Sequence, residues 1–317
     1  MDDLHSRRNF LKQSALAAAA LPLLPTTFAE AGIMADGALP DIHIFSKHLQ
    51  FLSYADMAAV AAEMGFKGID LTIRPQGHVL PERVEADLPK AVEAMKKVGL
   101  APQLMTTAVD DASDATSVRL LKTAAGLGFR TYRMAWYQYD ANRSLPESID
   151  QYRQQMQALG QLNKTLGLVG CYQNHAGQLV GASVWELWEM LRTADPQHMG
   201  IQYDIRHATV EGGLSWPNGL RLLQPRIKTL VLKDFRWEKK DGKWVVQNTP
   251  IGEGMVDFKT YFGLLKKYNL RVPISLHVEY PLGGAEEGAT RLSGSPERVF
   301  AAMKQDLARI RELWQVA

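Results

Sequence analysis

The chain has little cysteine and little excess charge. A single cysteine, Cys171, in 317 residues excludes an internal disulfide, so stability has to come from a large buried core. Lys and Arg number 36 against 34 Asp and Glu, a net charge of +2. This balance gives no basic surface for nucleic acid and no attraction to an acidic membrane. We therefore expect neither as a partner.

The N-terminal apolar run is too short for a membrane anchor. Pro22 and Pro25 interrupt it, and a spanning helix needs about 20 apolar residues. The run follows S-R-R-N-F-L-K at 6–12 and precedes A-E-A at 29–31, the order of a cleaved secretory signal. Paired arginines in this setting are typical of the twin-arginine route. We expect residues 1–31 to be a twin-arginine signal peptide, read by the twin-arginine export machinery, and residues 32–317 to be periplasmic or otherwise exported, without a stable anchor.

Behind the signal, apolar runs alternate with amphipathic stretches, as in βα units with a parallel sheet. The predicted strands are 42–46, 66–73, 100–106, 129–135, 168–173, 199–204, 227–234 and 272–279. The predicted helices are 54–64, 84–98, 113–127, 146–166, 183–193, 215–223, 258–268 and 296–314. Three of these helices end at a glycine (Gly65, Gly99, Gly128), as left-handed helix termini require. Residues 32–317 are therefore predicted to form one α/β domain, a (β/α)8 TIM barrel.

Two features refine this prediction. No G-x-G-x-x-G turn follows the first strand, which removes the main support for an open dinucleotide-binding sheet. Residues 235–248 interrupt the alternation and read as a hairpin that turns at Asp241-Gly242. The hairpin could cover the pocket or a neighbouring copy in a homo-oligomer, and the sequence does not choose between them.

In such a barrel the catalytic groups lie at the C-terminal ends of the strands. Polar and aromatic residues occur at each of the eight predicted ends: Ser46, Lys47 and His48; Arg74, Gln76, His78 and Glu82; Thr106 and Thr107; Arg133, Trp136 and Tyr137; Gln173, Asn174 and His175; Asp204, Arg206 and His207; Lys233 and Asp234; His277 and Glu279. Asp204 and His207 can aim a carboxylate and an imidazole into one cavity. His277 and Glu279 are two apart and point to the same side.

Several of these residues have a second interpretation. Arg74 and His78 are either substrate-binding groups or solvated loop residues. Trp136 and Tyr137 either stack on a sugar or pack in the core. His277, one layer below Glu279, is either a ligand or a buried structural histidine.

Taken together, six segments resemble the sugar phosphate isomerase/epimerase superfamily, whose members have a xylose isomerase-like barrel. They are E-M-G-F-K-G-I-D-L at 63–71, Q-N-H at 173–175, D-I-R-H at 204–207, K-D at 233–234, P-I-G-E-G at 250–254 and S-L-H-V-E at 275–279. The resemblance implies one divalent metal, Mn or Mg, bound by a Glu, an Asp, a His and a Glu on strands five to eight. At these positions the chain has Gln173, Asp204, Val231 and Glu279.

Two of the four implied ligands are therefore replaced. Gln173 brings no charge and Val231 cannot ligate a metal, so we expect a weakened or relocated metal. Imidazole suits Mn, Fe or Zn, which makes His175 and His277 candidates for the vacancy. The candidate metal ligands are then Asp204, Glu279, Gln173 and His277.

The resemblance implies an isomerase or epimerase that removes a proton beside the carbonyl of a sugar or keto-sugar. Gln173 cannot serve as a second base, so a one-base reaction is predicted. The expected catalytic residues are Glu279, His207, Lys233 and His175, and the expected substrate-binding residues are His48, Arg74, His78, Trp136, Asn174 and Arg206. Two alternatives stay open: a lyase or hydrolase of oxidised glycosides, and a non-catalytic carbohydrate-binding protein that uses Trp136, Tyr137 and Trp216.

Overall fold

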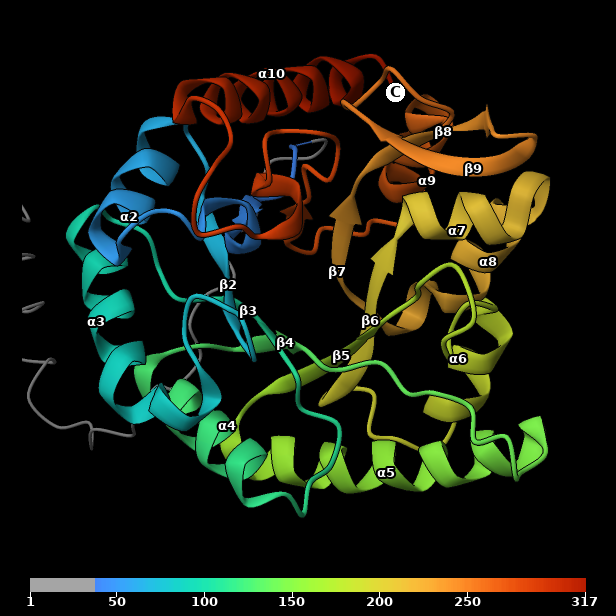
Figure 1. Ribbon diagram of the computed structural model, residues 1–317. Helices are drawn as coiled ribbons and strands as arrows, with labels where there is room; N and C mark the ends of the chain where they lie inside the picture. Colours follow the sequence, from blue (N-terminus) through green and yellow to red (C-terminus); the bar gives the residue numbers. More distant parts are fainter. Residues whose placement is uncertain (1–37) are drawn as a thin grey trace, which may run out of the picture. The chain divides into compact units, whose positions relative to one another are not determined.

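The computed structural model describes residues 38–317, so the predicted signal peptide lies outside the described residues. Eight parallel strands form a closed barrel (Figure 1). In chain order they are β1 (Ile42–Phe45), β2 (Gly68–Ile73), β3 (Leu104–Thr107), β4 (Thr131–Arg133), β5 (Val169–Gln173), β6 (Met199–Asp204), β7 (Ile227–Leu232) and β10 (Ile274–Leu276). Pairing of β1 with β10 closes the barrel. The predicted fold class, an α/β TIM barrel, is confirmed for this part of the chain.

Helices form the outer layer around the strands (Figure 1). They are α2 (Tyr54–Glu63), α3 (Val84–Lys97), α4 (Ala115–Leu127), α5 (Leu145–Leu166), α6 (Val184–Leu191), α7 (Ile205–Gly212), α8 (Trp216–Leu223), α9 (Phe258–Lys267) and α10 (Pro296–Gln315). Short 3-10 turns occur at η1 (Ser46–Leu49), η2 (Pro81–Arg83), η3 (Gly213–Ser215), η4 (Gln224–Arg226) and η5 (Ala285–Glu287). Between residues 38 and 317, none of the helices has the length and apolarity needed to cross a membrane.

The glycines after α2, α3 and α4 adopt the predicted left-handed conformation. Gly65, Gly99 and Gly128 have φ angles of 86°, 79° and 109°, a region that a side chain disfavours. Each helix can therefore stop and turn into the next strand within a few residues. This local rule produces the regular βα rhythm of the first half.

The strands bury apolar side chains on one face and polar ones on the other. Ile44 and Ile69 lie in the same core as Met57 of α2. Asp70, on the opposite face of β2, accepts hydrogen bonds from Thr106 Oγ1 at 3.0 Å and Ser275 Oγ at 2.7 Å. These bonds satisfy a carboxyl group whose pKa is raised by burial. The barrel interior is therefore polar, and its hydrogen bonds connect β2, β3 and β10.

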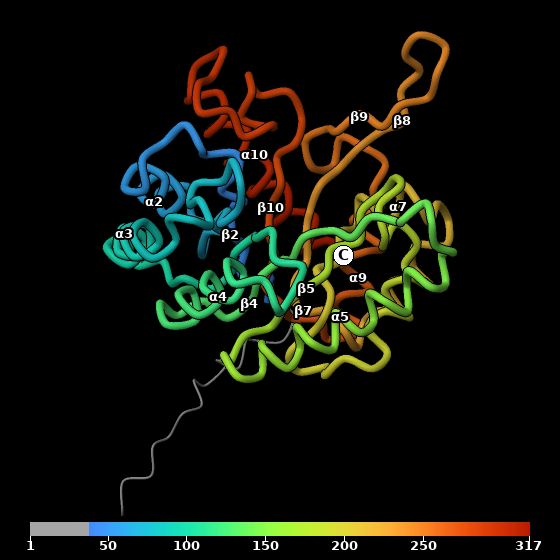
Figure 2. The backbone as a smooth tube through the Cα atoms, turned by 60° about the horizontal axis from the view of Figure 1, so that its bottom comes forward, coloured from blue at the N-terminus to red at the C-terminus, as the bar shows by residue number. Residues whose placement is uncertain are grey.

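The predicted hairpin is present as β8 (Asp234–Lys240) and β9 (Lys243–Thr249). Asp241 and Gly242 both have positive φ, 50° and 78°, as a two-residue hairpin turn requires. Figure 2 shows the hairpin extending away from the barrel. Its base is held by Asp234, whose carboxylate accepts bonds from the backbone N–H groups of three residues: Gly252, Gly254 and Val256.

Some boundaries differ from the predictions in ways that affect the site. The third strand begins at Leu104 rather than 100, and β10 covers only Ile274–Leu276, so His277 and Glu279 follow the strand instead of lying in it. The stretch after β6, for which no helix was predicted, forms helix α7. Asp204 starts this helix because its side chain accepts the backbone N–H of His207.

Candidate active site

The parallel register places the ends of β5, β6, β7 and β10 side by side, and their charged residues meet there. Lys233 Nζ lies 3.0 Å from Asp204 Oδ2 and 3.2 Å from Glu279 Oε2. Lys47, in the turn after β1, approaches Glu279 Oε1 at 2.9 Å. Asp204 and Glu279, far apart in the sequence, thus share one ammonium group. We call Asp204, Lys233, Glu279 and Lys47 the charged cluster.

Asp204 is fully buried, with 0% exposure, and both of its carboxylate oxygens have hydrogen-bond partners. Its Oδ2 accepts the Gln173 side-chain N–H at 2.8 Å, and its Oδ1 accepts the backbone N–H of His207 at 3.2 Å. Asn174 bonds to the backbone of Asp204 through both its amide oxygen and its amide nitrogen, at 2.8 and 2.9 Å. Asp204 is therefore fixed in place, and Asn174, predicted to bind substrate, is one of the residues that position it.

Glu279 is the accessible carboxylate of the charged cluster, with a side chain 22% exposed. Burial raises the pKa of its carboxyl, but the charges of Lys233 and Lys47 and the imidazole of His277 outweigh burial and hold the pKa well below its usual value. Glu279 is therefore ionised at neutral pH. An ionised, reachable carboxylate can accept a proton from a bound molecule.

His207 is a buried, neutral imidazole. Burial and then the charge of Lys233 hold its pKa well below the usual value. Its Nδ1 accepts the backbone N–H of Ala176 at 3.1 Å and lies 2.9 Å from Arg206 Nη1, and its Nε2 lies 2.9 Å from Lys233 Nζ, so both ring nitrogens face donors. Nε2 lies 3.5 Å from Asp204 Oδ2. The predicted catalytic histidine thus lies beside the charged cluster, next to Asp204 and Lys233.

Aromatic side chains lie next to the charged cluster. Trp136 donates from its ring N–H to the Gln173 carbonyl at 3.1 Å, and its ring is covered by the Arg133 guanidinium at 4.3 Å. His175 contacts the edge of Trp136, with ring centroids 4.6 Å apart. Trp136 and His175 are both half-buried, so part of each ring remains accessible. An aromatic face beside polar groups is suited to the apolar face of a sugar ring.

Two of the predicted substrate-binding histidines lie away from the charged cluster. His48 is fully buried, its Nδ1 lies 3.1 Å from the carbonyl oxygen of Ala285, and its Nε2 accepts the N–H of Val278 at 3.1 Å. It joins η1 to the chain after β10. His78 lines a separate cavity that also includes Tyr54 and Asp87.

The other predicted groups lie closer to the cluster. Arg206 donates to Asn248 Oδ1 at 3.2 and 2.9 Å, and Asn248 donates to the Glu279 carbonyl at 3.0 Å. Asn248, at the hairpin base, was missed because its sequence position gives no sign of this contact. Burial lowers the pKa of Arg74, while the charges of Asp70 and Glu279 oppose the shift.

His277 lies below Glu279, where it stacks on Phe45 with ring centroids 4.1 Å apart and planes inclined by 16°. It is 3% exposed, and its Nδ1 is 3.8 Å from Glu279 Oε1, beyond hydrogen-bond reach. Burial is the first cause that holds the pKa of His277 well below its usual value. Within residues 38–317 neither ring nitrogen of His277 has a hydrogen-bond partner, so the stacking on Phe45 is what holds the ring.

The residues present do not fit a divalent metal at this site. Val231, opposite Asp204 in the register of β6 and β7, is a buried aliphatic side chain. Gln173 turns its NH₂ toward Asp204, because its oxygen accepts Arg133 Nη1 at 2.9 Å. Across residues 38–317, His, Cys, Asp and Glu form no group of three or more that could hold a metal ion.

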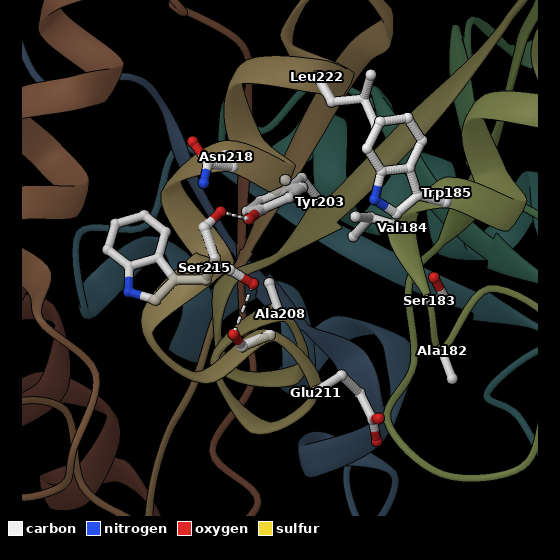
Figure 3. Close-up of a pocket in the computed structure, with 13 residues that line it drawn as sticks. Ala182, Ser183, Val184, Trp185, Tyr203, Ala208, Glu211, Ser215, Asn218 and Leu222 are labelled. Atoms are coloured by element: carbon white, nitrogen blue, oxygen red, sulfur yellow. Dashed lines mark hydrogen bonds between the residues drawn. The ribbon is translucent and has the colours of Figure 1, made fainter.

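A cavity of about 360 Å³ lies outside the charged cluster, among α6, α7 and α8 (Figure 3). Its walls include Trp185, Tyr203, Glu211 and Trp216. None of the four residues of the charged cluster lines it. Trp216, an alternative sugar-stacking residue in the sequence analysis, thus belongs to a different place from Trp136.

Solved structures share the fold at low sequence identity. A 3-keto-D-glucoside 4-epimerase from E. coli, YcjR, is 15% identical with a TM-score of 0.62, covering 86% of this chain and 100% of that one. A D-allulose 3-epimerase from Methylomonas sp. is 16% identical with a TM-score of 0.62, covering 87% and 99%. The probable 3-DHS dehydratase AsbF from Bacillus anthracis is 14% identical with a TM-score of 0.60, covering 85% and 99%.

No curated protein matches the sequence significantly. A family model described as "Xylose isomerase-like TIM barrel" matches residues 58–294, most of the sequence. The match includes β2 to β10 and three members of the charged cluster, Asp204, Lys233 and Glu279. The chain belongs to the xylose isomerase-like TIM barrel family.

Proposed function

We propose that the chain is an enzyme that removes a proton from the carbon beside the carbonyl of a sugar or keto-sugar. The names of two similar structures support this class of reaction. A 3-keto-glucoside 4-epimerase and an allulose 3-epimerase both invert a carbon that adjoins a carbonyl carbon. Inversion at such a carbon proceeds most simply through an enolate, which needs a base and a positive partner for the oxygen.

The observation that carries the proposal is the position of Glu279 between two ammonium groups. Its carboxylate lies 2.9 Å from Lys47 Nζ and 3.2 Å from Lys233 Nζ, and it is more exposed than Asp204. A base and two positive donors thus stand within one hydrogen-bonded group. These are the parts that enolate formation requires.

The chemical step uses these residues as follows. Glu279 takes the proton from the carbon, the electron pair of the broken C–H bond forms the C=C bond of the enolate, and the π pair of the carbonyl moves to its oxygen. Lys233 and Lys47 then donate hydrogen bonds to that oxygen. As their charge is drawn to the oxygen, it lowers the pKa of Glu279 less, so the carboxylate becomes a stronger base while the proton is transferred.

Because of Gln173, the site has a carboxylate base on only one face of a bound substrate. Its amide cannot accept a proton from carbon, and both ends of the amide are bonded, to Arg133 and Asp204. Glu279 can therefore return the proton only on the same face. Return to the same carbon exchanges the proton without inversion, and return to the neighbouring carbon of an enediol isomerises the sugar. Otherwise the enolate expels a leaving group from the neighbouring carbon. This last course makes a lyase acting on oxidised glycosides the alternative function, and it has a parallel in the dehydratase among the similar structures.

We also propose that the enzyme works outside the cytoplasm, because the sequence begins with the twin-arginine pattern. An exported enzyme meets few phosphorylated sugars. The proposed substrates are therefore free keto-sugars and glycosides oxidised at a ring hydroxyl. No phosphate-binding role is assigned to Arg74 or Arg206.

The test is exchange of solvent deuterium. The purified protein is incubated in D₂O with keto-sugars and 3-keto-glucosides, and the deuterium in substrate and product is measured by NMR and mass spectrometry. We expect incorporation at the carbon beside the carbonyl, and a loss of about 10²–10⁴-fold in rate for Glu279→Gln.

Glu253→Gln is the matched control, since Glu253 is an exposed glutamate outside the charged cluster, and it should exchange like the wild type. Sugar binding without exchange in any of these substrates would refute the proposal in favour of a carbohydrate-binding protein.

A further inference from the structure

The charged cluster contains its own cation. Asp204 and Glu279 would repel one another and would need a counter-charge to be ionised together in a buried site. Lys233 Nζ supplies it from a position bonded to both, at 3.0 and 3.2 Å. The Lys233 side chain is only 4% exposed, so water contributes little to the balance.

The hydrogen-bonding groups next to Lys233 are arranged for an ammonium group and not for a divalent metal ion. Arg133 can only donate, so Gln173 Oε1 must face it and Gln173 Nε2 must face Asp204. Turning the amide to offer its oxygen beside Asp204 would press the NH₂ group against the guanidinium. Burial lowers the pKa of Arg133 to about 10, which leaves it charged at neutral pH.

Val231 is the register neighbour of Asp204 on β7. It pairs with Asp204 in the parallel register of β6 and β7 and has 0% exposure. An aliphatic side chain at this position offers no donor atom to a metal ion. A divalent ion beside Asp204 would therefore meet Lys233, the amide NH₂ of Gln173 and a hydrocarbon wall.

We infer that Lys233 is the resident cation of this site and that the enzyme works without a bound divalent metal. This inference rests on the proposed function for the role of the ammonium, which is to donate to the enolate oxygen. The absence of metal dependence can be measured separately from turnover. The two ideas therefore fail in different experiments.

The first experiment measures Mn²⁺ binding directly. Purified protein is titrated with Mn²⁺ while free Mn²⁺ is followed by electron paramagnetic resonance, and thermal unfolding is recorded with Mn²⁺, with Mg²⁺ and with EDTA. We expect no stoichiometric binding and no change in Tm for the wild type. One Mn²⁺ per chain, lost in Asp204→Asn, would overturn the inference.

The second experiment rebuilds a metal site. The triple variant Gln173→Glu, Val231→His and Lys233→Ala removes the ammonium and supplies two ligands, and we expect it to bind Mn²⁺ with at least tenfold higher affinity than the wild type. The matched control is Lys239→Met, which removes an exposed lysine of the hairpin and should leave both titrations unchanged. A folded triple variant that binds Mn²⁺ no better than the wild type would count against the inference, because Lys233 would not be what excludes the ion.

Turnover separates the two ideas. Deuterium exchange that survives EDTA supports both the function and the inference. Exchange that requires added Mn²⁺ keeps the function and overturns the inference. If no sugar incorporates deuterium and the wild type does not bind Mn²⁺, the inference about the cation stands and the proposed function fails.

Discussion

Replacing Lys233 by Met tests the central interaction of the site. The side chain keeps its length and most of its volume but loses its charge, so Asp204 and Glu279 lose their shared partner. Removing one partner of a buried ion pair costs about 3–5 kcal/mol, and this range applies because Lys233 is 4% exposed and Asp204 0%. At about 2–4 °C per kcal/mol for a large domain, Tm should fall by roughly 6–20 °C.

The assay is thermal unfolding by circular dichroism, with the folded spectrum checked first. A double-mutant cycle with Asp204→Asn assigns the loss to this pair. The double variant should lose less stability than the sum of the two single variants, with a coupling of about 2–3 kcal/mol. Lys239→Met, on the exposed hairpin, should melt like the wild type. A Lys233→Met variant that melts within about 2 °C of the wild type would refute the reasoning, because it would show that the carboxylates need no cation.

Three further predictions follow from the described contacts. Because Lys233 and Lys47 hold the pKa of Glu279 below its ordinary 4.5 despite burial, kcat/KM should stay level down to that pH, and an acidic limb near neutrality would contradict Glu279 as the base. His48→Phe leaves the buried Val278 N–H without its partner, while the Ala285 carbonyl keeps the N–H of Gly288, and should lower the free energy of unfolding by about 1–3 kcal/mol in urea titrations. Burial raises the pKa of Asp306 from 3.8 to about 7, so the folded state holds a proton that the unfolded chain releases. Stability should therefore fall as pH rises from about 4 to about 7, and Asp306→Asn should remove that fall in thermal melts.

The fold could be predicted because its signals are local. Glycine ends a helix through its own backbone freedom, so Gly65, Gly99 and Gly128 predict where a strand must begin. Helix α7 was missed for a physical reason. The segment after β6 is polar and short, and its helix begins because the Asp204 side chain caps it. The same residue was interpreted only as a site carboxylate.

The candidate site was predictable only as a set of residues at strand ends. Their pairing depends on distances between segments far apart in the chain, and no local pattern contains it. His48 follows β1 as a substrate ligand would, yet it contacts Ala285 and Val278, 237 and 230 residues later. Lys47, its neighbour, instead reaches Glu279. Two adjacent residues thus have different roles, a structural contact for His48 and an ion pair in the charged cluster for Lys47, and only the fold distinguishes them.

A fixed ammonium and an exchangeable metal make different demands on a substrate. A divalent ion supplies two positive charges and binds oxygen directly, whereas Lys233 supplies one charge through hydrogen bonds that it already shares between Asp204 and Glu279. Lys233 then stabilises an enolate less than a divalent ion would, because its charge is partly neutralised by the two carboxylates. Under the proposed function, such a site suits carbons acidified by a free ketone better than carbons beside a carbonyl masked as a hemiacetal or hemiketal. This physical limit, rather than the family name, is the reason to begin the search for substrates with 3-keto-glucosides.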